Sequence, residues 1–244
     1  MKKIALAAAL TVAFAGAASA ADLAARPYTK APPPIVSVYN WTGFYVGGQV
    51  GWAEAKEDWF LIQNAVGFGF KKDSVIAGGY AGYNWQVGSN FVIGAEVEGS
   101  WADLRQSNIP CTIAQAAICR NDVKALGSIR GRAGVAFNQI LLYAAGGWAV
   151  ADVTYDRQFL PLGGGPFTSG VNDTRDGWVA AVGVEWMFAQ NWIGRVQYDH
   201  YDFGTKTYLV PALSNVSDTR VSTTVDSVRV GLAYKFGGPV VAKY

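Results

Sequence analysis

Charged residues recur at alternate positions within apolar segments of the chain. Within residues 91–103, Glu96 and Glu98 occupy one face of a predicted strand. Phe91 and Val97 occupy the opposite face, because side chains alternate between the two faces of a strand. The same reasoning along the chain predicts ten charges on one common face: Glu96, Glu98, Lys124, Arg130, Arg132, Glu185, Arg195, Asp199, Arg229 and Lys235.

Two kinds of chemistry are open to these ten residues if the strands close into a barrel. The interior of an eight-stranded barrel is nearly filled by its own side chains, so acids and bases would pair there and plug the centre. The alternative is a narrow water path that favours anions, because bases in this set outnumber acids by six to four.

Cys111 and Cys119 bracket a short segment in a long predicted loop. In an oxidising compartment, two such cysteines predict a disulfide that stabilises the loop. A metal or redox site is the competing interpretation. With two thiols and no histidine nearby in the sequence, the residues favour the disulfide.

His200 is the single histidine of the chain. By alternation it lies with Val196 and Tyr198 on the apolar face, near the rim of a strand. A histidine beside a tyrosine there is typical of an amphipathic anchor at a membrane interface. The alternative role is that of an axial haem ligand, which His200 or a tyrosine could supply.

The sequence contains no motif typical of an enzyme. The run Gly163–Gly165 lacks the following Lys-Ser/Thr of a phosphate loop, and no nucleophile elbow or paired-acid arrangement stands out. We therefore expect no catalytic residues, no resident cofactor and no metal. The nearly balanced charge also gives no basic footprint for nucleic acid.

The first residues are typical of a secretory signal peptide. Lys2 and Lys3 precede a short apolar run, and Ala18-Ser19-Ala20 supplies the small residues that signal peptidase needs. A retained anchor is disfavoured because the run is short. We predict a signal peptide at 1–20, a Pro-rich periplasmic linker at 21–40, a barrel at 41–236 and a C-terminal tail at 237–244.

Eight segments carry the period-2 pattern, and we predict strands at 42–54, 73–87, 90–104, 122–137, 140–154, 176–189, 192–204 and 222–236. Tight turns and long polar links alternate between them, which is typical of an up-and-down outer-membrane barrel. An apolar outer face opposite inward charges, behind a signal peptide, favours the same architecture. The segment 140–154 is apolar on both faces, so its orientation stays open.

Tryptophans lie near the ends of the predicted strands, where two girdles at the membrane interfaces are expected. The six that we assign to these girdles are Trp52, Trp85, Trp101, Trp178, Trp186 and Trp192.

Several motifs resemble one known family, in order along nearly the whole mature chain. They are GFYVGGQVGW, GYNWQ, GSIRGRAGVAF, LLYAAGGWA, GWVAAVGVEWMF, VQYDHYDFG and VRVGLAYKFGG. They resemble the alphaproteobacterial major outer-membrane protein family, OmpA-like eight-stranded barrels described as porin-family proteins. The resemblance implies a role as an envelope-structural protein, a surface antigen, a porin or a haemin binder. Either Phe236 or the terminal Tyr244 is expected to be the assembly signal.

The sequence as a whole predicts an all-β, eight-stranded antiparallel transmembrane barrel in the outer membrane of a Gram-negative bacterium. The favoured function is structural, stabilising the envelope and displaying surface loops. Alternatives are a surface protein that binds haem or a host partner, a narrow anion-favouring pore, and a secreted lipocalin-like carrier. The expected partners are outer-membrane lipid, lipopolysaccharide and, during insertion, the barrel-assembly machinery, with a monomer as the expected state.

Overall fold

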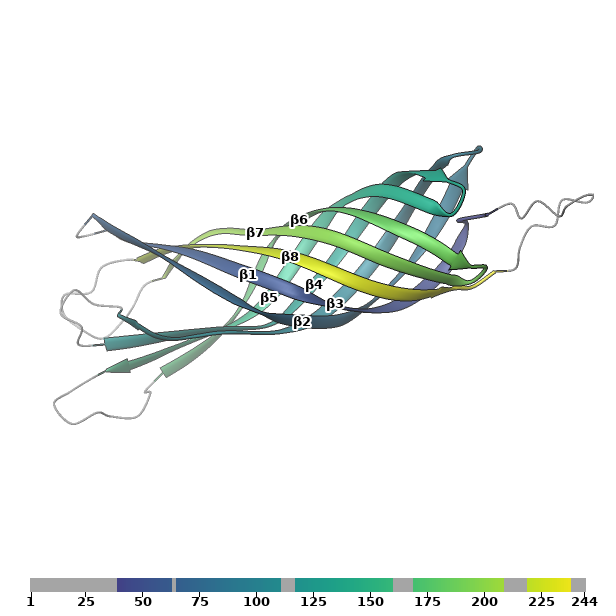
Figure 1. Ribbon diagram of the computed structural model, residues 1–244. Helices are drawn as coiled ribbons and strands as arrows, with labels where there is room; N and C mark the ends of the chain where they lie inside the picture. The colour runs from purple at the N-terminus through teal and green to yellow at the C-terminus, as the bar shows by residue number, and fades with distance from the viewer. Residues whose placement is uncertain (1–38, 63–64, 111–116, 160–168, 209–218, 238–244) are drawn as a thin grey trace, which may run out of the picture. The chain divides into compact units, whose positions relative to one another are not determined.

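Eight antiparallel strands form a closed barrel in the computed structural model (Figure 1). The structure describes residues 39–62, 65–110, 117–159, 169–208 and 219–237. The strands are β1 (Gly43–Leu61), β2 (Val66–Val87), β3 (Phe91–Pro110), β4 (Ala117–Phe137), β5 (Ile140–Phe159), β6 (Ser169–Ala189), β7 (Trp192–Tyr208) and β8 (Thr219–Lys235).

Some of the predicted features lie outside the described residues. These are the signal peptide predicted at 1–20, residues 21–38 of the linker predicted at 21–40, and the tail from residue 238. Cys111, which we expect to form a disulfide with Cys119, also lies outside the described residues. Within the part of the chain that is described, no helix is both long and apolar enough to cross a membrane.

Each strand pairs with the next along the chain, and β1 pairs with β8 to close the ring. The closing register runs from Tyr45 opposite Lys235 to Leu61 opposite Thr219, and Figure 1 shows the two strands side by side. Closure gives every strand two hydrogen-bonded neighbours, so the sheet has no open edge. The predicted eight-stranded up-and-down topology is confirmed.

Three connections are tight turns at one end of the barrel. Residues 88–90 join β2 to β3, residues 138–139 join β4 to β5, and residues 190–191 join β6 to β7. Gly88 and Asn138 adopt positive φ angles of 69° and 53°, which glycine and asparagine tolerate better than other residues. These turns lie where the sequence predicts them, and we call this the turn end.

At the opposite end, which we call the loop end, the strands run further than predicted. β1 continues to Leu61 and β2 begins at Val66, so most of the long polar link expected between them is a paired hairpin. Charged residues and glycines interrupt its apolar residues, which made the segment look like a loop. Ladder hydrogen bonds join backbone groups, however, and form whatever the polarity of the side chains.

The two faces of the sheet have opposite chemistry. On β3, the Phe91 side chain is 64% exposed on the outer wall, whereas Glu96 is 2% exposed in the interior. β5, which the sequence could not orient, turns Leu141 and Tyr143 inward and Trp148 outward. The barrel is therefore apolar outside and charged within, the inverse of a soluble barrel.

Glycines on the inner face make room for three tyrosine rings. A Cβ atom added at Gly183 would lie 2.5 Å from the Tyr143 hydroxyl, and one at Gly47 would lie 2.6 Å from the Tyr80 ring. A Cβ at Gly82 would collide with Tyr45 in the same way. Each tyrosine ring thus packs against a neighbouring strand at a glycine, where a hydrogen atom takes the place of an inward side chain.

Gly183→Val should therefore destabilise the barrel by about 1–3 kcal/mol, because the added side chain must displace Tyr143. Urea unfolding in lipid vesicles, followed by heat-modifiable gel mobility, measures the change. Gly131→Val is the matched control, since a Cβ at Gly131 meets no atom within 4 Å. Equal stability of the two variants would contradict the packing role of Gly183.

Candidate functional site

Eight of the ten predicted charges meet in the middle of the barrel interior. They come from β3, β4, β6, β7 and β8 and are all buried. We call them the charge network: Glu96, Glu98, Arg130, Arg132, Glu185, Arg195, Asp199 and Arg229.

Glu96 is the centre of the network, because three arginines converge on its carboxylate. The Arg130 Nε lies 3.1 Å from Glu96 Oε1, and the Arg132 Nη1 lies 3.3 Å from Oε2. The Arg195 Nη2 lies 2.5 Å from the same Oε2. The Tyr45 hydroxyl also donates to Oε2 at 2.8 Å, so neighbouring groups contact both oxygens of this buried carboxylate.

The remaining carboxylates extend the network in two directions. Glu185 accepts from Arg195 Nη2 at 2.7 Å and lies 2.9 Å from Arg132 Nη2. On the other side, Glu98 pairs with both Arg130 and Arg229. Each carboxylate thus bridges two or more arginines, which is the arrangement that offsets the cost of burying charge.

Asp199 completes the second branch. Its Oδ1 accepts from Arg130 Nη1 at 2.7 Å and from the Gln197 amide at 2.6 Å. Its Oδ2 lies 3.4 Å from the Arg229 Nε. The network therefore forms a continuous lattice that ties non-adjacent strands across the interior.

Aromatic rings hold two of the guanidinium groups in place. The guanidinium carbon of Arg132 lies 4.0 Å from the centre of the Tyr143 ring, and that of Arg195 lies 3.8 Å from the centre of the Tyr80 ring. Cation–π contacts at this distance are favourable, and more so away from water. The inner glycines thus support the network indirectly, by letting these tyrosines lie flat.

Lys124 is a correction to the predicted set. It is exposed, whereas its neighbour Val123 is only 2% exposed and points inward. The pairing of β4 with β5 shifts register between Val123 and Ala125, which is the mark of a β-bulge. A bulge adds one residue to the strand, so strict alternation assigns the wrong face beyond it.

Lys235 is buried but stands apart from the network. Its Nζ donates to the Thr42 carbonyl at 3.3 Å, at the turn end. With Lys124 outside the barrel and Lys235 at its mouth, the network holds four arginines and four carboxylates. The excess of bases that suggested an anion path is therefore absent from the described charge network.

Two apolar clusters lie in the barrel interior, one on each side of the charge network. The sequence pattern predicted charged residues on the inner face but did not predict these clusters. The cluster towards the loop end is Ala53, Ala55, Ile76, Ala102, Val123, Leu126, Ala149, Ala151, Val153, Val179, Tyr201, Phe203 and Val225. The cluster towards the turn end is Trp41, Tyr45, Tyr80, Val92, Ala136, Leu141, Tyr143, Met187, Ile193 and Ala233. Water and ions would have to pass both clusters to traverse the barrel.

Trp41 fills the turn-end cluster from outside the strands. Its side chain is fully buried, and its Nε1 donates to the Asn138 carbonyl at 3.3 Å. Its backbone N–H donates to the Gln86 side chain at 2.9 Å. Strand alternation could not reveal this role, because Trp41 precedes β1.

A second polar group missed by the sequence analysis surrounds Arg175 on β6. The guanidinium is 2% exposed and donates to the Thr223 hydroxyl at 2.7 Å and to the carbonyls of Gly204 and Val221, both at 3.1 Å. Arg175 lies in the part of β6 that precedes the predicted strand. Because it lies before the apolar segment that defined the predicted strand, strand alternation did not assign it to the interior.

All six predicted girdle tryptophans are exposed on the outer wall, between 43% for Trp192 and 75% for Trp101. Trp85, Trp186 and Trp192 lie near the turn end, and the other three lie further along their strands. Trp148, which the sequence analysis left unassigned, is also 53% exposed on this wall.

His200 also lies on the outer wall. Its Nδ1 is 2.7 Å from Asp226 Oδ1, which the Tyr198 hydroxyl contacts as well. The Trp178 ring packs against the imidazole with 5.5 Å between centres. Among the described residues, no group of three or more His, Cys, Asp or Glu side chains is placed to hold a metal ion.

Arg195→Ala should lower the free energy of unfolding by about 3–5 kcal/mol, because it leaves Glu96 and Glu185 with one buried partner fewer. Urea titration of the refolded barrel in vesicles measures this change. Combining Arg195→Met with Glu185→Gln should recover part of the loss, since the charge imbalance disappears.

Lys124→Met is the control, because this exposed side chain lies outside the network and should change stability by less than about 0.5 kcal/mol. A large loss in that variant, or none in Arg195→Ala, would contradict the assignment of the two residues.

The chain is similar to known outer-membrane proteins. Residues 5–236 match the family model described as outer membrane protein beta-barrel domain. The 25 kDa outer-membrane immunogenic protein of Brucella abortus is 28% identical over 97% of this chain and 99% of its own length. The 31 kDa outer-membrane immunogenic protein of Brucella melitensis is 29% identical over 97% of this chain and 100% of its own.

A further relative is the 22 kDa outer membrane protein of Rhizobium leguminosarum, 29% identical over 83% of this chain and 82% of its own. Among solved structures, the outer membrane protein OprG of Pseudomonas aeruginosa matches with a TM-score of 0.48 and 12% identity. That match covers 82% of this chain and 98% of OprG.

Proposed function

Because the chain belongs to the outer membrane protein beta-barrel domain family and lies in the outer membrane, we propose that it acts as a closed structural barrel. It reinforces the envelope and carries extended hairpins at the cell surface. It transports no solute through its interior, and we assign it no catalytic step.

The observation that carries this proposal is the neutral charge network between two apolar clusters. An ion entering the barrel would have to break buried pairs such as Arg195 with Glu185, and removing one partner of such a pair costs several kcal/mol. The balance of four arginines and four carboxylates offers no net charge to replace the lost hydration of an ion. The network thus locks the strands together instead of lining a path.

The hairpins at the loop end support the display part of the proposal. Beyond the exposed Trp52, β1 continues for nine residues to Leu61, paired throughout with β2. At about 3.3 Å per residue, this arm is roughly 30 Å long. Relatives of this chain are named outer-membrane immunogenic proteins, which agrees with loops that reach outward.

The outer wall carries aromatic side chains suited to both interfaces of the membrane. Exposed tryptophans near the turn end and further up the strands would anchor the barrel at the two interfaces. In this proposal the barrel is a monomer, contacts outer-membrane lipid and lipopolysaccharide, and is inserted by the barrel-assembly machinery.

Purified protein in planar bilayers should give negligible conductance, since the network and both clusters close the interior. Trp41→Gly should stay closed as well, because the network and the loop-end cluster remain in place. A large general porin measured in the same bilayers verifies that channels can be detected. A stable, reproducible conductance of the wild-type protein would overturn the closed-barrel proposal.

Deleting the gene should make the envelope leakier, which uptake of a hydrophobic fluorescent dye and release of periplasmic enzymes would measure. A barrel whose first hairpin is shortened at the paired residues Ala55 and Lys72 should restore the envelope as well as the wild type, because the barrel wall is intact. If the shortened barrel folds but fails to restore it, the hairpin carries the function and the structural proposal is wrong.

A further inference from the structure

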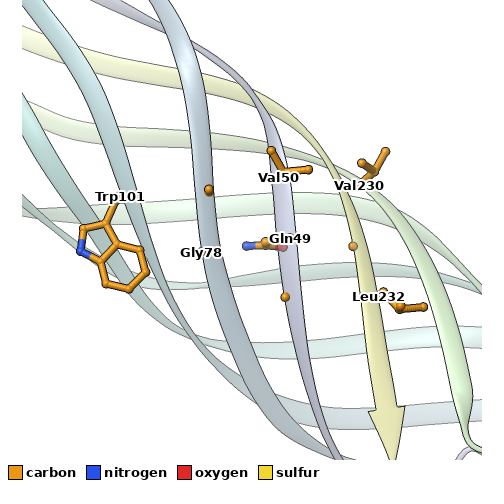
Figure 2. A pocket seen from close by; sticks show the side chains of 9 residues that line it. Gln49, Val50, Gly78, Trp101, Val230 and Leu232 are labelled. Carbon is orange, nitrogen blue, oxygen red and sulfur yellow. The ribbon is translucent and has the colours of Figure 1, made fainter.

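The outer wall is not uniformly convex, because a groove crosses β8, β1, β2 and β3. It encloses about 670 Å³ and is lined almost wholly by apolar atoms. Figure 2 shows Trp101 at one side of this groove and Val230 and Leu232 at the other, with Val50 and Gly78 between them.

Gly48 lines the floor of the groove, and the row of paired residues that contains it carries glycine on β2 and β3 as well. Leu232 lies opposite Gly48, Gly48 opposite Gly79, and Gly79 opposite Gly99. The next row towards the loop end is bulkier, with Val230, Val50, Ala77 and Trp101 in register. Three neighbouring strands thus lack a side chain along this row, beside a bulkier row that ends in the Trp101 indole.

The packing of the barrel does not require these outward glycines. A Cβ at Gly48 would meet only the Gly78 carbonyl at 3.9 Å, and a Cβ at Gly99 would meet no atom within 4 Å. The inward Gly47 and Gly183 are different, because a Cβ there would collide with tyrosine rings. The absence of a side chain at Gly48 and Gly99 is therefore a feature of the outer surface and not a consequence of how the interior is filled.

The groove is inclined across the membrane. Its lower end at Leu232 is three residues before Lys235, where β8 reaches the turn end, whereas Gly99 is eight residues into β3 from Phe91. The row of paired residues therefore climbs from the turn end towards the loop end. A chain lying in it would have its upper end beside Trp101.

Lys124 lies at this upper end, and Asp152 of β5 lies opposite its neighbour Ala125. The bulge in β4 turns Lys124 outward, and the next residue, Ala125, is the cross-strand partner of Trp101. Lys124 is exposed, and the indole of Trp101 is 75% exposed. An indole with a nearby ammonium group is suited to the level where acyl chains meet charged headgroups.

We propose that this groove holds one acyl chain of a phosphate-bearing lipid of the outer leaflet, with Lys124 contacting the headgroup phosphate. The groove is continuous with the lipid-facing wall, and its cation complements the anionic headgroup. A second barrel is a poorer occupant, because two convex walls bury little area and the Trp101 side chain projects between them. This inference does not depend on whether the interior conducts.

Native mass spectrometry of the purified protein, with diphosphoryl lipid A added in detergent, tests the proposal. Wild-type protein should bind one lipid. Gly48→Leu should weaken binding about tenfold by filling the floor. Lys124→Gln should weaken it about fivefold, the effect expected for one lysine at a lipid surface.

Gly131→Leu is the matched control and should bind as the wild type does, since it adds the same side chain to open space elsewhere on the outer wall. Lipid A without phosphates should bind the wild type about as weakly as diphosphoryl lipid A binds Lys124→Gln. In Lys124→Gln, removing the phosphates from the lipid should weaken binding no further. Equal binding by all variants would overturn the proposal. So would a change of oligomeric state in Gly48→Leu with unaltered lipid binding, which would mean that the groove takes a second copy.

Discussion

The barrel depends on the neutralisation of charge in its interior. Four arginines and four carboxylates are withdrawn from water, and each carboxylate lies between two or more guanidinium groups. Burying any of these groups alone would be costly, so the lattice is stable only as a whole. The tyrosines that stack on the arginines, and the glycines that leave room for those tyrosines, follow from this requirement.

Most of the fold could be predicted from the sequence because one physical rule governs it. A barrel in lipid must present apolar residues at alternate positions, and segments such as 91–103 carry apolar residues at alternate outward positions, with Glu96 and Glu98 on the inner face. The number of strands, the tight turns and the inward placement of Glu96 and Arg195 followed directly. The ends of the strands towards the loop end did not, because charged residues and glycines interrupt the alternation there.

The site was harder to predict where the chain departs from regular geometry. A single bulge beside Lys124 reversed the predicted face, and no residue type in that segment signals it. Trp41 precedes the strands, so its position depends on tertiary contacts with Gln86 and Asn138. The charge balance of the predicted set changed from an excess of bases to a neutral network of eight residues once Lys124 and Lys235 were located.

The pairing of β1 with β8 joins the two ends of the barrel sequence over 17 residues. The strand that seals the cylinder is therefore the last of the eight strands to be synthesised and translocated. Until β8 arrives, β1 presents a row of unpaired backbone groups that cannot be left facing hydrocarbon. The topology thus makes the arrival of β8 a precondition for closing the barrel, because the pairing of β1 with β8 is the contact that closes it.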